Sequence, residues 1–212
     1  HISGIKKRSI RISGEQPAVM MIIIFQTLLM VIGMVTGEEH SNRGIRAYTP
    51  FGYGWGVAIR IVAGKTSVYC ALYAIFAFFL LGLLPHFFSI PNIGNGLYIV
   101  LLLIPYLMAT SFLGLAASRY FTDSEAPLLM IAFFSVGLIF LSGVSYPMEL
   151  MPWYWKAAHY ILPAAPGTLA FVKLNSMGAS MADIRPEYIT LWIQVFIYFI
   201  ISIWVYKKKL EI

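Results

Sequence analysis

Leu97–Ser118 reads LYIVLLLIPYLMATSFLGLAAS, and this stretch contains no charged side chain. About 20 consecutive apolar residues are enough for an α-helix to cross the hydrocarbon core of a bilayer. The run is continuously apolar and does not alternate between apolar and polar residues, as the strands of a membrane β-barrel do. The stretch therefore predicts a membrane-spanning helix.

Four further stretches share this character. None of them contains Lys or Arg, and nearly all acidic residues of the chain lie between them. In a bilayer only helices and closed barrels satisfy their backbone hydrogen bonds, so long apolar runs of this kind indicate helices. The sequence therefore predicts an all-α membrane protein with five spanning helices, at approximately 17–36, 66–88, 97–118, 128–146 and 188–206.

The composition of the whole chain supports this fold class. Of its 212 residues, 59% are hydrophobic and 11% are charged, and the mean hydropathy is +0.78. Soluble domains have roughly 25% charged residues, so a soluble enzyme and a disordered segment are excluded. The net charge of +6 comes from short basic clusters, which orient membrane helices and do not indicate nucleic-acid binding. The single cysteine, Cys70, excludes a disulfide framework.

The start of the chain and its sidedness leave alternatives open. The chain begins with His1 and not with Met, which suggests a fragment or a trimmed sequence. A basic tail precedes the first apolar run, as in a signal peptide, but the run is too long and lacks a cleavage site, so a retained helix is expected. Basic residues are distributed almost evenly between the two sides of a five-helix topology, so their count does not decide the orientation.

No catalytic or metal-binding motif is apparent. Gly64-Lys65-Thr66 is like the end of a phosphate-binding loop, but Ile59 stands where that motif needs a glycine. The HExxH pattern of zinc proteases is absent, and the spans hold essentially no ionisable residues that would indicate an ion pathway. We therefore expect a chain that is not an enzyme and carries no cofactor or metal of its own.

A few polar residues lie deep within the predicted spans, notably Gln26, Thr110, Ser111 and Gln194. Such side chains usually form hydrogen bonds between membrane helices, worth about 1 kcal/mol each. For Gln26 the alternative is that the side chain faces a substrate path.

Two connections are too long to be turns. Residues 37–65 begin with the charged sequence GEEHSNRG and end with VAIRIVAGK, which predicts a short amphipathic helix on the membrane surface. The alternative is interfacial packing with an aromatic belt. In 147–187, Pro147 and Pro152 bracket Glu149, which indicates a broken or re-entrant backbone and a structured cap on the non-cytoplasmic face.

Three motifs occur in a characteristic order along the predicted helices. Gly37-Glu38-Glu39 with Gly44 follows the first span, Gly64-Lys65 precedes the second, and SGVSYP at 142–147 is followed by Met151-Pro152. In this order the sequence resembles the membrane subunit of type-2 ABC exporters, especially the drug-export-like permeases. The resemblance covers roughly 17–209 and lacks the first helix and external domain of that family. Ala164–Gly167 also lacks the polar turn residues usual in the family.

The resemblance implies a single permease domain over 17–209, with residues 1–16 as an external tail or the remnant of an external domain. It places the connector 37–65 and the C-terminus in the cytoplasm of a multi-pass protein of the cell membrane. The connector would dock on a separate ATPase subunit, which binds ATP and Mg. The coupling residues carried over from the family are Glu38, Glu39, Arg43, Gly44 and Arg46.

The resemblance also implies that the segment 147–187 is an outer cap that folds partly back into the membrane. The residues assigned to this outer re-entrant segment are Ser142, Gly143, Pro147, Glu149, Met151, Pro152 and Trp153.

The function expected from the resemblance is ATP-driven export of an amphiphilic small molecule or lipid-like substrate, as in multidrug efflux. The partners would be an ATP-binding-cassette subunit, a second permease subunit in a homodimer or heterodimer, and membrane lipid, with no nucleic acid. The candidate lining residues of the substrate path are Phe25, Gln26, Met30, Phe133 and Phe134. The rival hypothesis is a membrane scaffold or assembly protein without a transport cycle, and a membrane enzyme ranks third.

Overall fold

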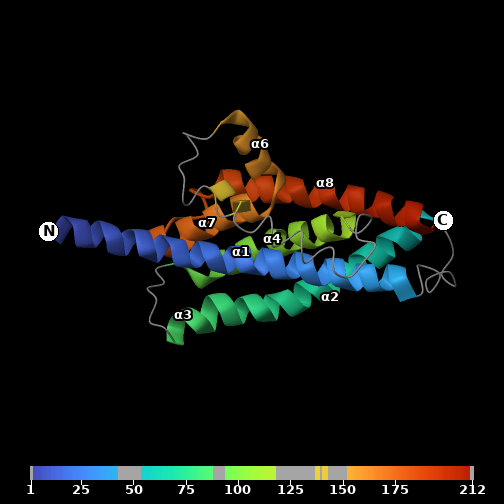
Figure 1. The fold of residues 1–212 in the computed structure, drawn as a ribbon, viewed down its shortest axis with the longest axis horizontal. Helices are drawn as coiled ribbons and strands as arrows, with labels where there is room; N and C mark the ends of the chain where they lie inside the picture. Colours follow the sequence, from blue (N-terminus) through green and yellow to red (C-terminus); the bar gives the residue numbers. More distant parts are fainter. Residues whose placement is uncertain are drawn as a thin grey trace.

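The computed structural model describes residues 2–42, 54–87, 94–117, 137–138, 140–142 and 152–210. These residues form helices joined by short segments, and no strand occurs among them, which confirms the all-α fold class. The elements in chain order are α1 (Ile2–Asn42), α2 (Trp55–Phe78), the π-helix η2 (Phe79–Leu83), α3 (Leu84–Phe87), α4 (Gly96–Ala117), α6 (Trp153–Ile161), α7 (Ala164–Met177) and α8 (Arg185–Leu210) (Figure 1).

Four helical stretches in the described part of the chain are long and apolar enough to cross a membrane. They are Gln16–Glu39, Trp55–Leu83, Gly96–Ala117 and Arg185–Lys208. They correspond to the predicted spans 17–36, 66–88, 97–118 and 188–206. The predicted span 128–146 lies outside the described residues except for 137–138 and 140–142, so a fifth crossing stays a prediction.

The second spanning helix begins much earlier than its hydropathy indicated. Residues 57–65, expected as a separate amphipathic helix, form the first turns of α2, which begins at Trp55. Charged side chains such as Arg60 and Lys65 mark the end of an apolar run, but both residue types favour helix, so the backbone continues through them. The helix is preceded by Gly54, whose φ of 148° lies in the region that glycine adopts most readily.

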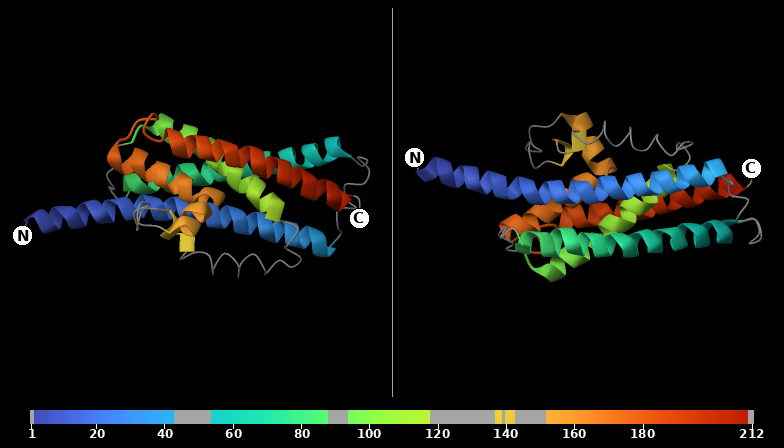
Figure 2. Two further views of the ribbon diagram at one scale, coloured as in Figure 1. Left: turned by 90° about the horizontal axis from the view of Figure 1, so that it is seen from above. Right: turned by 60° about the horizontal axis from the view of Figure 1, so that its bottom comes forward.

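Helix α4 is the centre of the bundle, because it contacts α1, α2, α7 and α8. In Figures 1 and 2, α1, α4 and α8 run in one direction and α2 runs in the other. The C-terminal ends of α1 and α8 therefore meet the N-terminal half of α2 at one end of the bundle, which we call the Lys65 end. Helix α7 lies toward the opposite end, which we call the α7 end, and α6 projects from it.

Helix α7 is short and almost completely enclosed by α1, α4 and α8. Its 14 residues extend over about 21 Å, less than the roughly 30 Å of a hydrocarbon core, so it cannot span a bilayer alone. The small residues Ala164–Gly167 allow this close packing. A Cβ on Gly167 would lie 2.2 Å from Cδ2 of Tyr106, and the Tyr106 hydroxyl donates to the Met21 carbonyl at 2.7 Å.

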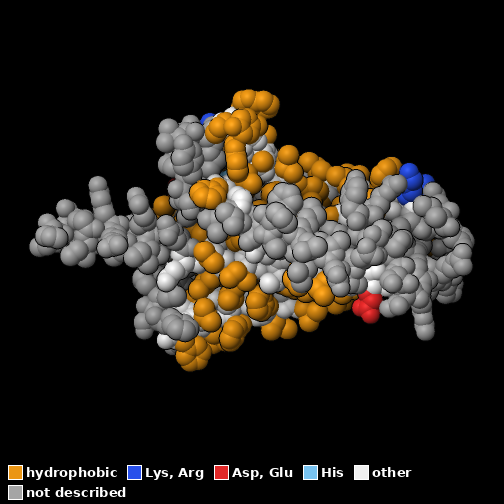
Figure 3. Space-filling view, in the orientation of Figure 1, with side chains coloured by type: hydrophobic (Ala, Val, Ile, Leu, Met, Phe, Trp, Pro, Cys, Tyr) orange, Lys and Arg blue, Asp and Glu red, His pale blue; other side chains and the backbone are white. Residues whose placement is uncertain are grey.

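The outer surface of the bundle is apolar between two charged ends. Helices α2 and α8 expose large hydrophobic side chains along their length, including Val68, Leu72, Phe196 and Ile200. Figure 3 shows hydrophobic side chains along the middle of the molecule, with basic and acidic side chains at the end where the chain terminates. A surface of this kind suits lipid contact, since lipid and not water surrounds the middle of a spanning helix.

Candidate functional site

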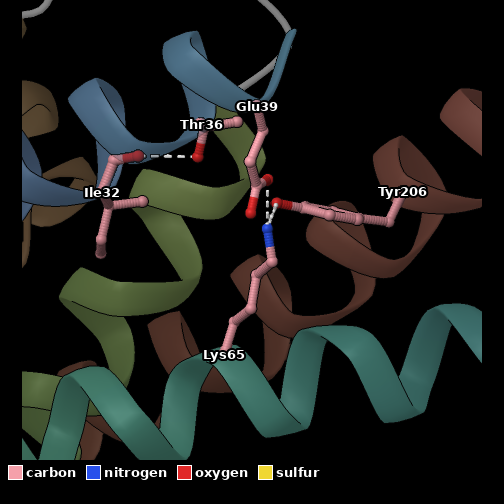
Figure 4. A network of polar contacts seen from close by, with 5 residues as sticks. All are labelled: Ile32, Thr36, Glu39, Lys65 and Tyr206. Atoms are coloured by element: carbon pink, nitrogen blue, oxygen red, sulfur yellow. Dashed lines mark hydrogen bonds and ion pairs between the residues drawn. The ribbon is translucent and has the colours of Figure 1, made fainter. Parts of the chain in front are cut away.

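Three helices join at the Lys65 end through a network of polar side chains. Lys65 on α2 donates from Nζ to Oε2 of Glu39 on α1 at 2.5 Å, and to the hydroxyl of Tyr206 on α8 at 3.4 Å (Figure 4). The side chains of Lys65 and Glu39 are 14% and 30% exposed. The network therefore fixes the end of α1 against the first half of the spanning stretch of α2 and against the last turn of the spanning stretch of α8.

The partial burial of this ion pair determines how it behaves energetically. Two unit charges about 4 Å apart attract by roughly 4 kcal/mol at an effective dielectric constant near 20. The net gain is much smaller, because both groups lose part of their hydration on folding. Removing one partner costs more than the pair contributes, since the remaining charge stays partly buried without compensation. Glu39 and Lys65 therefore depend on each other at this position.

Contacts between lysine side chains and aromatic rings surround the same end. The Nζ atom of Lys207 lies 4.6 Å from the centre of the Trp55 ring, which connects the end of α8 to the first turn of α2. Lys65 lies 5.4 Å from the centre of the Tyr206 ring, so it contacts this tyrosine through both the hydroxyl and the ring face. Each such contact contributes about 0.5–1 kcal/mol at an exposed position.

The predicted coupling residues fall partly within this region. Glu39 forms the ion pair, and the neighbouring Glu38 is exposed at the same end of α1. Arg43, Gly44 and Arg46 lie outside the described residues. The structure thus brings the Glu38-Glu39 motif and the Gly64-Lys65 motif together, while their role in coupling stays a prediction.

Sequence reasoning missed Tyr206 and the contact between Trp55 and Lys207. No helical spacing connects positions 39, 65 and 206, because each lies on a different helix. One available signal was the position of Tyr206 immediately before the Lys207–Lys209 cluster, since tyrosine at the end of an apolar helix is typical of a membrane interface.

The predicted substrate-path residues lie on different surfaces of the bundle. Phe25 is 5% exposed and belongs to the hydrophobic core, whereas Gln26 and Met30 are half-buried on α1. Phe133 and Phe134 lie outside the described residues. Within this chain, Gln26 and Met30 therefore remain the accessible candidates of the set.

The outer re-entrant set is only partly described. Ser142 is buried, and its backbone N–H donates to the Leu138 carbonyl at 2.9 Å. Pro152 precedes α6 and Trp153 begins it, with an exposed indole. The remaining members of the set, Gly143, Pro147, Glu149 and Met151, lie outside the described residues, so the re-entrant backbone stays a prediction.

Helix α6 is held by side chains from α8 and by its own histidine. Gln194 Nε2 donates to the Tyr160 carbonyl at 2.7 Å and the Tyr198 hydroxyl donates to the Ile161 carbonyl, which satisfies acceptors at the end of α6. The hydrogen bond between helices expected for Gln194 is therefore confirmed. His159 is buried and donates from Nδ1 to the Leu141 carbonyl at 2.7 Å.

Burial lowers the pKa of His159 below the ordinary value of an imidazole, and the hydrogen bond to Leu141 together with the nearby Glu187 carboxylate offsets this effect only in part. Because a carbonyl oxygen can only accept, Nδ1 is the donor of the hydrogen bond that connects α6 to the short segment 140–142.

A second ion pair lies at the α7 end. Lys173 on α7 donates to Oε1 of Glu187 on α8 at 2.5 Å, the same distance as in the Glu39–Lys65 pair, and its side chains are similarly buried. The other oxygen of Glu187, Oε2, is buried and has no hydrogen-bond partner. This pair provides a matched control for experiments on the Lys65 end.

No cluster of three metal-ligating side chains occurs in the described ranges. The polar network holds α1, α2 and α8 together at the Lys65 end, and it leaves the adjacent acidic Glu38 exposed at the surface.

Comparison with known proteins gives one match. The model of a family described as ABC-2 family transporter protein matches residues 16–204. Neither the search of curated proteins nor the search of solved structures found a significant match to the chain. The matched range includes three of the four spanning stretches completely and the fourth as far as Trp204, so it contains Glu39 and Lys65 but ends before Tyr206.

Proposed function

The chain belongs to the ABC-2 transporter family, and from this membership we propose that it exports an amphiphilic or lipid-like molecule when a partner subunit hydrolyses ATP. The family makes it a multi-pass membrane protein and a permease component of an ABC transporter, a class that works with an ATP-binding-cassette subunit. Export, the substrate class and the docking site are the parts that we propose.

The observation that carries the proposal is the Glu39–Lys65–Tyr206 network. It joins the two motifs at the beginning and end of the segment 37–65, and it lies where the spanning parts of α1 and α8 end and the first half of α2 passes them. A partner that pushes on this end acts on three helices at once, because the network holds them together. The exposed Glu38 and the rest of the connector provide the proposed contact surface.

The orientation is part of the proposal and rests on the resemblance to the exporter permeases. Basic side chains lie toward both ends of the bundle, with Lys207 and Lys208 at one and Lys173 and Arg185 at the other, so they do not decide it. We propose that the Lys65 end and the C-terminus are cytoplasmic and that α6 and α7 lie toward the outer face.

A rigid-body mechanism follows from the packing. Helix α7 lies between α1, α4 and α8, so a displacement of these helices at the cytoplasmic end also moves α7 near the outer end. Rigid-body movement of packed helices is a common form of conformational change in proteins. We propose that two such chains, related by a two-fold axis, alternate in this way around a path that Gln26 and Met30 help to line.

The rival hypothesis is a membrane scaffold that binds other proteins without a transport cycle. A scaffold has no need of a charged connector between two spanning helices, nor of a polar network that joins three helices beside it. The network therefore favours a permease whose helices are moved at the Lys65 end by a partner subunit.

Transport in inside-out membrane vesicles distinguishes the two functions. The vesicles contain the chain together with the ATP-binding-cassette subunit expressed with it, and an NBD-labelled phospholipid and a fluorescent cationic dye are the probes. We expect movement of at least one probe into the vesicle lumen with ATP, and none with a non-hydrolysable ATP analogue. Equal movement with both nucleotides, in vesicles whose ATPase subunit is bound and hydrolyses ATP, would favour the scaffold.

A further inference from the structure

A groove lies between α2, with its π-helical continuation η2, and the central helix α4. Its volume is about 610 Å³. The lining side chains are apolar apart from the thiol of Cys70. They belong to Cys70, Ala74, Ala77, Phe78, Leu81, Gly82, Gly96, Ile99, Val100, Leu103, Ile104, Leu107 and Met108. The groove belongs neither to the polar network nor to the proposed path beside Gln26.

The length of the groove matches one leaflet of a bilayer. On α2 its lining extends from Cys70 to Gly82, and on α4 from Gly96 to Met108. Twelve residues of helix rise by about 18 Å, and half of a hydrocarbon core is about 15 Å thick. Cys70 Sγ lies 3.9 Å from the Ser111 hydroxyl, which places the deep end of the groove near the middle of the two spans. The other end, at Gly82 and Gly96, is on the side of the α7 end.

The size of the groove suits a small apolar occupant. A volume of about 610 Å³ lies in the range of pockets that hold one small molecule, and a single hydrocarbon chain is an occupant of this size.

Two glycines and the π-helix shape the open end. A Cβ on Gly96 would meet no atom within 4 Å, and a Cβ on Gly82 would meet only the ring of Phe78 at 3.8 Å. The missing side chains therefore leave room that another residue would fill. The π-helix Phe79–Leu83 lies beside them, and such segments often occur at functional sites.

The groove is continuous with the lipid-facing surface. Phe78, Val100 and Ile104 line it and are also strongly exposed on the outside of the bundle. It therefore opens sideways toward the hydrocarbon and does not open toward water. An occupant can enter from the bilayer without exposing its apolar chain to solvent, and burial of that chain against apolar side chains stabilises the complex.

We propose that this groove binds one acyl chain of a membrane phospholipid from the leaflet at the α7 end. The lining residues provide no hydrogen-bonding groups along its length other than the thiol at its deep end, so recognition rests on shape and apolar contact. The occupant is a resident lipid, distinct from the exported molecule, and the proposal requires only that the chain spans a membrane.

A phospholipid with a photoreactive diazirine in its acyl chain tests this proposal. The full transporter complex is reconstituted with the probe and irradiated, and the labelled residues are located by mass spectrometry. We expect labelling concentrated in 70–82 and 96–108, above that of the equally lipid-exposed face of α8 around Phe196. Gly96→Phe and, independently, Ala74→Phe should remove most of the groove labelling. Val68→Phe, on an exposed position of α2 outside the lining, should leave it unchanged.

Two results would overturn the proposal. Labelling that is equal in the groove and on α8, and insensitive to both groove-filling variants, identifies ordinary lipid contact. Groove labelling that disappears during ATP turnover and returns without ATP identifies a transported molecule in place of a resident lipid. Labelling that is specific to the groove and independent of ATP supports a resident lipid in the groove.

Discussion

Lys65→Glu is expected to release the ATP-binding-cassette subunit and to abolish ATP-driven transport. The substitution places a second carboxylate against Glu39 in a partly buried site, where like charges repel and neither is fully hydrated. The end of α1 must then move away from α2 and α8, and the adjacent Glu38 moves with it. Retention of the ATPase subunit during affinity purification of the chain measures the effect.

The exchange of both charges is the informative control. Glu39→Lys combined with Lys65→Glu restores an opposite-charge pair, so we expect the double variant to recover a large part of ATPase binding. Coupling between the two substitutions is expected, because residues in one ion pair are not energetically independent. If the double variant binds no better than the single ones, the pair does not act by holding the helix ends together.

The pair at the α7 end controls for stability. Lys173→Glu breaks an ion pair of the same length and similar burial, so it should lower the unfolding temperature about as much as Lys65→Glu does. The ATPase subunit should nevertheless stay bound, because this pair lies at the opposite end of the bundle. Equal loss of ATPase binding in both variants would mean that general destabilisation causes the effect.

Gly167→Ala is expected to cause a large loss of stability, since no other glycine with known surroundings would bring a new Cβ so close to a neighbouring atom. The new Cβ would lie 2.2 Å from Tyr106, whose ring is completely buried and whose hydroxyl is bonded to Met21. Neither the ring nor α7 can move without disturbing α1 and α4. Overpacking of this kind typically costs about 1–3 kcal/mol and occasionally more, which lowers the unfolding temperature by roughly 2–4 °C per kcal/mol for a chain of this size.

Thermal unfolding of the detergent-solubilised protein, followed by tryptophan fluorescence, measures this loss. Gly56→Ala is the matched control, because a Cβ at Gly56 meets no atom within 4 Å and alanine favours helix more than glycine does. We expect Gly56→Ala to be neutral or slightly stabilising. An unfolding temperature of Gly167→Ala equal to that of the unsubstituted chain would show that α7 does not pack against Tyr106 as described.

The fold class and four of the spans could be predicted from the sequence, because long uncharged apolar runs leave helices as the only common solution in a bilayer. The residue at which α2 begins could not be predicted in this way. Hydropathy shows which residues are apolar, whereas a helix continues through polar residues as long as its backbone hydrogen bonds continue. Arg60 and Lys65 therefore ended the predicted span without ending the helix.

The packing of α7 could not be predicted from the sequence for a related reason. Small residues such as those in Ala164–Gly167 permit close helix contact, but the sequence does not show which neighbouring side chain packs against them. In the structure that neighbour is Tyr106 on α4. Sequence motifs indicated Glu39 and Lys65 separately, but their ion pair connects two helices and depends on how these helices pack.

The most direct test of the account asks which end of the bundle contacts the ATPase subunit. In a Cys70→Ser background, which removes the only native cysteine, single cysteines replace Glu38 at the Lys65 end and Met177 at the α7 end, both of which are exposed. Each carries a short thiol-anchored photocrosslinker in the assembled complex. We expect a crosslink to the ATPase subunit from position 38 and none from position 177. A crosslink from position 177 with none from position 38 would contradict docking at the Lys65 end.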